Sequence, residues 1–125
     1  MSGAGPTRHA DGRAAEALAA RLLEDRGLAI VARNRRTRRG EIDLVALDGD
    51  CLVFVEVRLR RGGAHGDAAA SLTPRKRARM IAAAEDYLAG LASEPPCRFD
   101  VVLLDGLAPE RVRWLRDVID TSGDD

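Results

Sequence analysis

The sequence predicts one α/β domain with the element order α-β-β-β-α-β, arranged in three layers around a mixed central sheet. Two stretches carry apolar residues at helical spacing, and four carry the alternation or short apolar runs of strands. The 125 residues suit one compact core, and a hydrophobic fraction of 46% with a charged fraction of 32% is typical of a folded chain. We expect the domain to span residues 11–120, with flexible ends at 1–10 and 121–125.

The first half of the chain predicts a helix and three strands. Asp11 is a candidate N-cap for a helix that ends at Gly27, and apolar residues recur inside it at Ala15, Leu18, Ala19 and Leu22. A short strand is expected at residues 28–32 and a basic connector at 33–39. Strands at 41–47 and 51–59 flank the turn signal Asp48-Gly49-Asp50, which predicts a hairpin.

The second half predicts a helix and one or two further elements. Residues 62–71 are rich in glycine and alanine and read as a loop, and Thr73-Pro74 is a good helix start. One face of that helix is marked by Ile81, Ala84, Leu88 and Leu91. Residues 98–104 predict a buried strand, and 110–120 favour a weaker strand or a short helix around Trp114.

Several classes of protein are disfavoured by the sequence. No apolar run approaches the length of a membrane span, and the N-terminus lacks the hydrophobic stretch of a signal peptide, so we expect a cytoplasmic protein without a membrane partner. Cys51 and Cys97 lie far apart, and so do His9 and His65, which makes a disulfide or a zinc site improbable.

The formal net charge is zero, but the charges alternate in blocks along the chain. Residues 8–39 carry a net +5, 40–53 a net −4, 54–80 a net +5 and 81–125 a net −6. A short acidic segment between two arginine-rich ones favours a cation site beside a surface that binds a polyanion. A solvated surface with local clustering explains the same pattern about as well.

Two strand carboxylates form the strongest candidate site. Side chains alternate along a strand, so Glu41 and Asp43 share one face, and Glu56 shares a face with Arg58. A hairpin would bring Asp43 close to Glu56, and oxygen ligands of this kind suit Mg²⁺ or Mn²⁺. Glu56 interrupts an apolar strand, where an unpaired carboxylate is costly. A salt bridge from Glu56 to a neighbouring arginine is the structural alternative.

The sequence resembles the YraN family, also called UPF0102, over residues 11–104. The strings that carry the resemblance are Gly40-Glu41-Ile42-Asp43-Leu44, Phe54-Val55-Glu56-Val57-Arg58, Thr73-Pro74-Arg75-Lys76 and Arg98-Phe99-Asp100-Val101. The family's fold is similar to the restriction-endonuclease-like PD-(D/E)XK nucleases and Holliday-junction resolvases. The resemblance therefore implies Mg²⁺- or Mn²⁺-dependent hydrolysis of phosphodiester bonds in DNA, branched or single-stranded.

The resemblance assigns roles to individual residues. Asp43 and Glu56 would bind the metal, with Glu16 and Glu41 supporting it. The family pattern has lysine where this chain has Arg58, and arginine cannot act as a general base. Arg58 would contact phosphate instead, and Lys76, the one lysine of the chain, would either replace the missing amine or bind phosphate.

The basic segments would then bind successive phosphates of the nucleic acid. The candidate nucleic-acid-binding residues are Arg33, Arg35, Arg36, Arg38, Arg39, Arg60, Arg61, Arg75 and Arg77. Two alternatives to a nuclease stay open: a nucleic-acid-binding module that no longer cleaves, which Arg58 favours, and an adaptor whose acidic C-terminal part meets a protein. Related nucleases often form homodimers, but nothing in this sequence identifies a dimer interface.

Overall fold

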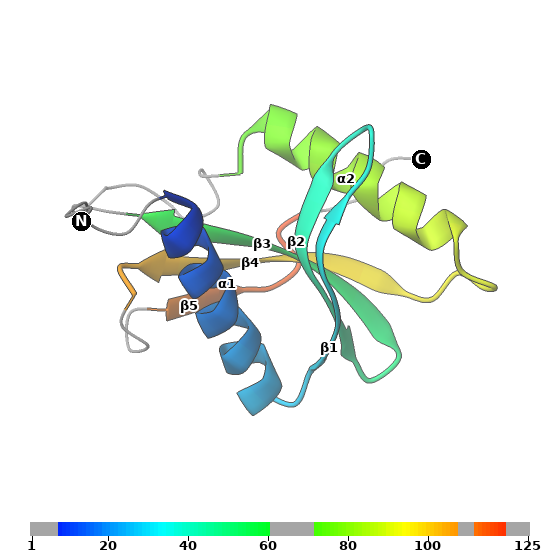
Figure 1. The fold of residues 1–125 in the computed structure, drawn as a ribbon. Coiled ribbons are helices and arrows are strands. Elements are labelled where there is room, and N and C mark those ends of the chain that lie inside the picture. The colour runs from blue at the N-terminus through cyan, green and yellow to red at the C-terminus, as the bar shows by residue number, and fades with distance from the viewer. Residues whose placement is uncertain (1–7, 61–71, 108–111, 120–125) are drawn as a thin grey trace.

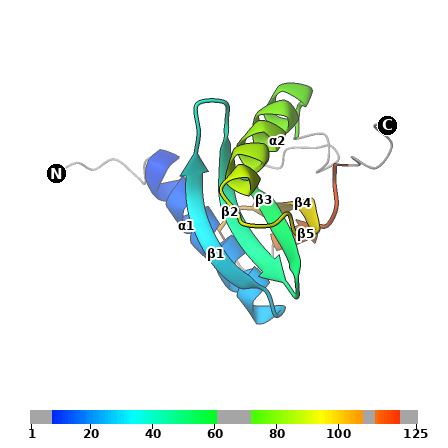
Figure 2. The ribbon, with the colours of Figure 1, turned by 90° about the vertical axis from the view of Figure 1, so that its right-hand side faces the viewer.

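The computed structural model describes residues 8–60, 72–107 and 112–119, the side chains of 8–11 and of Arg60 excepted. A five-stranded sheet with the order β1-β2-β3-β4-β5 forms the middle of the molecule. Helix α1 covers one face of this sheet and helix α2 covers the other, as the two views of Figures 1 and 2 show. The prediction of one three-layer α/β domain with a mixed sheet is confirmed.

Helix α1 spans Arg8–Asp25 and begins earlier than expected, so the prediction of an N-cap at Asp11 is wrong. Arg8, His9 and Ala10 contain no helix breaker, and a helical start at Arg8 is therefore unopposed. The C-terminal end agrees with the prediction. Gly27 adopts a positive φ of 95°, and the N–H of Leu28 donates to the Leu23 carbonyl at 3.0 Å, which is a Schellman cap.

Strand β1, Ala29–Arg36, is longer than predicted and absorbs half of the expected basic connector. Arg33 pairs with Leu44 of β2 and Arg35 pairs with Ile42. β1 lies at the edge of the sheet, and its backbone pairs with β2 on one side only. Its arginine side chains remain in water, so the strand can form without alternating apolar residues. The connector is reduced to the tight turn between Arg36 and Glu41.

Strands β2, Glu41–Asp48, and β3, Cys51–Arg60, form the predicted antiparallel hairpin. Asp48 pairs with Cys51 across the turn, and Gly49 takes the left-handed conformation there with a φ of 62°. Successive side chains of each strand point to opposite faces of the sheet, so Val53 and Val55 pack toward α1 while Leu52 and Phe54 pack toward α2.

Helix α2, Pro74–Ala89, connects β3 to β4, Cys97–Asp105, which pairs with β3 in parallel. Thr73 caps the helix as predicted, because its hydroxyl accepts a hydrogen bond from the N–H of Lys76. The expected apolar face is wrong at one position: Leu91 lies beyond the end of the helix and is 40% exposed. The loop expected at 62–71 lies outside the described residues.

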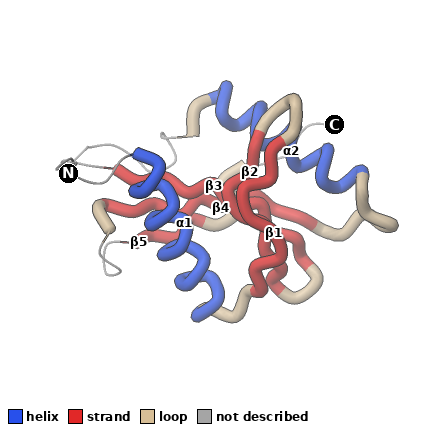
Figure 3. The backbone as a smooth tube through the Cα atoms, viewed as in Figure 1, coloured by secondary structure: helices blue, strands red, loops and turns tan. Residues whose placement is uncertain are grey.

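Strand β5, Val112–Leu115, completes the sheet antiparallel to β4, which resolves the segment around Trp114 as a strand (Figure 3). The tail at 121–125 lies outside the described residues. Within the part of the chain that the structure describes, no helix is both long and apolar enough to cross a membrane.

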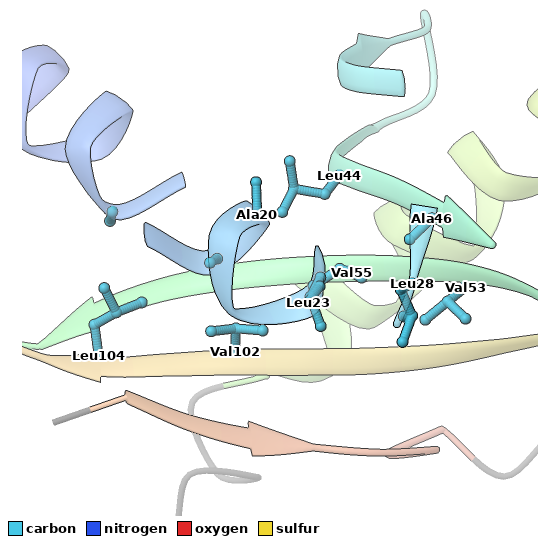
Figure 4. Close-up of a cluster of buried hydrophobic side chains, with 11 residues drawn as sticks. Ala20, Leu23, Leu28, Leu44, Ala46, Val53, Val55, Val102 and Leu104 are labelled. Carbon is cyan, nitrogen blue, oxygen red and sulfur yellow. The ribbon is translucent and has the colours of Figure 1, made fainter. Parts of the chain in front are cut away.

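Two apolar clusters hold the three layers together. Beneath α1, Ala20 and Leu23 pack on Val53, Val55 and neighbouring strand residues, as Figure 4 shows. The second cluster lies under α2 and contains Ile42, Val45, Phe54, Met80, Ala83, Phe99 and Val101. The alanines on the buried face of each helix allow the helix to pack close to the sheet.

Candidate metal and phosphate site

The site begins where β2 and β3 diverge. Backbone pairing between these strands runs from Asp48 and Cys51 to Leu44 and Val55, and the next residues outward are Asp43 and Glu56. Beyond that point β3 continues its pairing with β4, while the Asp43 carboxylate accepts a hydrogen bond from the Val57 N–H at 2.8 Å. The hairpin thus brings Asp43 and Glu56 together, as the sequence predicted.

A cleft of about 230 Å³ opens at this point between the strand ends and the first turns of α2. Its lining residues are Glu41, Asp43, Glu56, Val57, Arg58, Lys76 and Arg79. The four residues predicted from the sequence to be catalytic therefore lie around one cavity, although they come from three different elements: Asp43, Glu56, Arg58 and Lys76.

Burial is the main electrostatic influence on the carboxyl groups of the cleft, and their closeness to one another adds to it. Burial raises the pKa of Asp43 to about 7, and repulsion from Glu56 adds to the rise, whereas the hydrogen bond from Val57 opposes it. Glu16 and Glu41 contribute smaller repulsions of the same sign. The site therefore disfavours negative charge on Asp43 unless a cation is close by.

Glu56 is held in a similar environment but has cationic neighbours. Burial raises its pKa, while Lys76, Arg58 and a hydrogen bond with the Asp43 carboxyl counteract that rise. The Glu56 side chain is 14% exposed, and its Oε2 lies 3.7 Å from Nη1 of Arg58. The salt bridge considered as the structural alternative for Glu56 is thus present, beside a second carboxyl that it does not neutralise.

The start of α2 supplies the opposite wall of the cleft. Because Thr73 fixes the first turn, Lys76 and Arg79 come one helical turn apart on the side that faces β2 and β3. Gly40 makes this approach close: a Cβ at that position would overlap the backbone carbonyl of Arg79. Gly40 was not among the predicted site residues, and its position directly before the strand that begins at Glu41 was the available signal.

The predicted metal ligands fall into two groups. Asp43 and Glu56 lie next to each other in the cleft, and Glu41 also lines it. Glu16 on α1 acts on Asp43 through its charge and does not line the cavity. Among the described residues no three acidic, cysteine or histidine groups gather as a complete metal cage. Two hard carboxyl oxygens that repel each other nevertheless fit Mg²⁺ or Mn²⁺, which keep waters and substrate oxygens as their other ligands.

The predicted phosphate-binding arginines occupy different surroundings. Arg75 and Arg77 are exposed on the first turns of α2, beside the cleft. Arg33 and Arg38 are exposed on β1 and its turn, and Arg35 lies over the Tyr87 ring at 5.6 Å from the ring centre. Arg61 and the side chain of Arg60 lie outside the described residues.

Two arginines of the β1–β2 hairpin already have acidic partners. Arg36 lies 3.9 Å from Glu41, both largely exposed. Arg39 is more firmly held, because its Nη2 donates to Oδ1 of Asp86 at 2.6 Å and to the Ala82 carbonyl at 3.2 Å, with Glu85 at 3.4 Å from Nη1. Arg39 therefore fastens the hairpin to α2.

A different polar cluster lies in the sheet itself. Asp100 is fully buried and accepts hydrogen bonds from Arg98 Nε at 3.1 Å, Trp114 Nε1 at 2.9 Å and the Asp117 N–H at 2.9 Å. Arg98 also donates to Asp48 at 3.0 Å. The cluster joins the β2–β3 turn to β4 and β5, and its carboxylate has every oxygen occupied, which indicates a structural role.

Comparison with known proteins identifies related chains along most of the sequence. The profile described as "Uncharacterised protein family UPF0102" matches residues 15–104. A UPF0102 protein of Ralstonia nicotianae is 53% identical over 117 residues, covering 90% of this chain and 88% of the relative. A UPF0102 protein of Nitrosococcus oceani is 50% identical over 119 residues, covering 90% and 94%. One from Nitrosomonas europaea is 44% identical over 111 residues, covering 89% and 94%.

Proposed function

The chain belongs to the UPF0102 family, and we propose that it is a divalent-metal-dependent nuclease that hydrolyses phosphodiester bonds in DNA. The observation that carries this proposal is the pair of half-buried carboxyl groups, Asp43 and Glu56, in a cleft whose other charged groups are cations apart from Glu41. Carboxylates that repel each other beside groups suited to phosphate are the arrangement that metal-assisted phosphoryl chemistry needs.

Asp43 and Glu56 would hold a Mg²⁺ or Mn²⁺ ion. Such an ion, when bound, supplies Lewis-acid stabilisation of the charge that develops on the phosphate. The hydrogen bond from Val57 fixes one oxygen of Asp43, and the rigid pairing of β3 with β4 fixes Glu56. The two ligands are thereby pre-organised and lose little side-chain freedom when a cation and a phosphate arrive.

The cationic wall would bind the scissile phosphate. Arg58 and Arg79 carry planar guanidinium groups suited to two phosphate oxygens at once. Lys76 is the one lysine of the chain and lies in the cleft, so its side-chain amine is the group that can deprotonate an attacking water, which arginine cannot do. PD-(D/E)XK nucleases, which the family resembles, have a lysine at the position that Arg58 occupies in this chain. Lys76 would take over the role of that lysine.

The surrounding arginines support a DNA backbone as the substrate. Arg75 and Arg77 extend the positive surface along α2, and Arg33 and Arg38 extend it along the β1 side. Backbone contacts of this kind give affinity that falls steeply with salt and carries little sequence information.

The test is a cleavage assay on single-stranded, linear duplex, flapped and four-way DNA with Mg²⁺ or Mn²⁺. Asp43→Asn and Glu56→Gln should each lower the rate by about 10²-fold or more, because each removes a charged ligand without changing shape. Glu24→Gln, on the exposed side of α1, is the matched control and should leave the rate unchanged. Absence of metal-dependent cleavage on every substrate would refute the proposal.

A second candidate function is a DNA-binding module with this fold that does not cleave. The observation that favours it is the ion pair between Arg58 and Glu56, which places a permanent cation against one of the two metal ligands. Salt-sensitive DNA binding without cleavage would select this alternative, and absence of DNA binding at low salt would exclude both.

A further inference from the structure

Arg58 and Glu56 lie two residues apart on the same face of β3, so their contact is built into the strand. Nη1 of Arg58 is 3.7 Å from Oε2 of Glu56, and the two side chains are 34% and 14% exposed. In the described part of the chain, Arg58 is the cation within ion-pair distance of Glu56. Lys76 acts on Glu56 through its charge from beyond that distance, and Arg79 lines the cleft without such a contact.

A cation at Glu56 competes with any metal for the same oxygen atoms. Arginine is effectively always protonated in proteins, so the competition cannot be relieved by deprotonation. It can be relieved by exchange of partners, because phosphate offers guanidinium the same two-oxygen geometry as carboxylate. The Arg58 side chain is long and more exposed than Glu56, and it is therefore the member of the pair that can move.

We propose that Arg58 is an exchangeable counter-ion: it forms an ion pair with Glu56 in the free protein and passes to a backbone phosphate when DNA enters the cleft. The inference rests on the proposed function and adds to it a coupling between metal and substrate. Divalent cations bind the carboxylate pair weakly in the free protein and more tightly once DNA has drawn Arg58 away. Because coupling is reciprocal, the cation strengthens DNA binding by the same factor.

The first experiment measures Mn²⁺ binding alone, by calorimetry or by the paramagnetic resonance of free Mn²⁺, at one ionic strength. Arg58→Gln should bind Mn²⁺ at least about fivefold more tightly than the wild-type chain. In the wild type, Mn²⁺ must break the Arg58–Glu56 ion pair, which costs about 1 kcal/mol, and the variant has no such pair to break. Arg79→Gln is the matched control, because it removes the same charge from the same cleft without a contact to Glu56. It should change the affinity by less than about twofold.

Arg58→Lys separates contact from charge, and it remains available if the glutamine variant does not fold. Lysine retains the charge without the planar fork, so its Mn²⁺ affinity should lie between those of the wild type and Arg58→Gln. Far-ultraviolet circular dichroism and the melting temperature establish that each variant is folded before its affinity is compared.

The second experiment adds a short single-stranded phosphorothioate oligonucleotide, which keeps the backbone charge and resists hydrolysis. It should raise the Mn²⁺ affinity of the wild type by about fivefold and that of Arg58→Gln by much less. Three outcomes would each overturn the counter-ion role. The oligonucleotide could raise the Mn²⁺ affinity of both proteins equally, Arg58→Gln could bind Mn²⁺ no more tightly than the wild type, or Arg79→Gln could change the Mn²⁺ affinity as much as Arg58→Gln does. Mn²⁺ binding without cleavage would refute the nuclease proposal alone, and absence of Mn²⁺ binding in every protein would refute both.

Discussion

The Val57 N–H donates a hydrogen bond to Oδ2 of Asp43 over 2.8 Å, so a side chain continues the pairing of β2 with β3 where the backbone pairing ends. The two strands separate without leaving this N–H group unsatisfied, and the separation opens the cleft. This hydrogen bond therefore serves both the fold and the proposed metal site, because the Asp43 carboxylate that satisfies the Val57 N–H is also the one that Glu56 repels.

The pKa of Asp43 predicts an unusual pH dependence of stability. The folded chain keeps the Asp43 proton up to about pH 7, whereas the unfolded chain releases it near 3.8. The folded state therefore binds more protons between these values, and its free energy of unfolding falls as the pH rises through that window. Urea unfolding in the presence of a chelator at about pH 5 and pH 8 measures the change.

Asp43→Asn should weaken this dependence, because asparagine carries no proton to lose and still accepts the bond from Val57. Glu24→Gln, an exposed position on α1, should retain it. The assignment to Asp43 is wrong if the asparagine variant loses as much stability on going to high pH as the wild type does.

Gly40→Ala should destabilise the chain by roughly 1–3 kcal/mol, because the added methyl group meets the Arg79 carbonyl and forces the hairpin and α2 apart. Gly12→Ala is the control: it lies in α1 with nothing within 4 Å of the new Cβ, and it should stabilise by roughly 0.5–1 kcal/mol. Denaturant midpoints measure both, and a neutral Gly40→Ala would disprove the close approach.

Asp100→Ala should cost about 3–5 kcal/mol, because it leaves the largely buried Arg98 side chain without its main partner and Trp114 Nε1 without an acceptor. Asp48 is the other partner of Arg98, and its side chain is 39% exposed. Asp48→Asn should therefore lower the free energy of unfolding by clearly less than Asp100→Ala does. Trp114 is the one tryptophan in the chain, so its fluorescence follows unfolding directly. Equal losses in the two variants would contradict the central role of Asp100.

Salt dependence of DNA binding should distinguish the arginines. Arg75→Gln removes an exposed positive charge near the cleft. It should reduce the slope of log DNA affinity against log salt concentration by about 1. Arg39→Gln should leave that slope nearly unchanged, because Arg39 is engaged with Asp86 and Glu85. The interpretation of Arg39 as a structural clamp fails if both substitutions lower the slope alike.

Local chemistry made much of this molecule predictable from its sequence. Alternation located β2 and a valine-rich apolar run located β3, the turn at Gly49 joined the two strands, and the hairpin placed Asp43 beside Glu56. Thr73-Pro74 marked the start of α2 for an equally local reason, a hydroxyl cap followed by a residue that needs no N–H partner. At the N-terminus local signals were misleading, since Asp11 resembles a cap but lies inside α1.

The sequence by itself determined the order of the two helices and the first four strands, the fold class and the carboxylate pair, because periodicity, caps and turns are set by near neighbours in the chain. The tertiary structure decided which cations reach that pair. Lys76 and Arg79 line the cleft because Gly40 lets α2 approach, and Arg39 is committed to α2 because Asp86 lies opposite it. Such contacts join residues far apart in the chain, and their geometry exists after helix and sheet have packed.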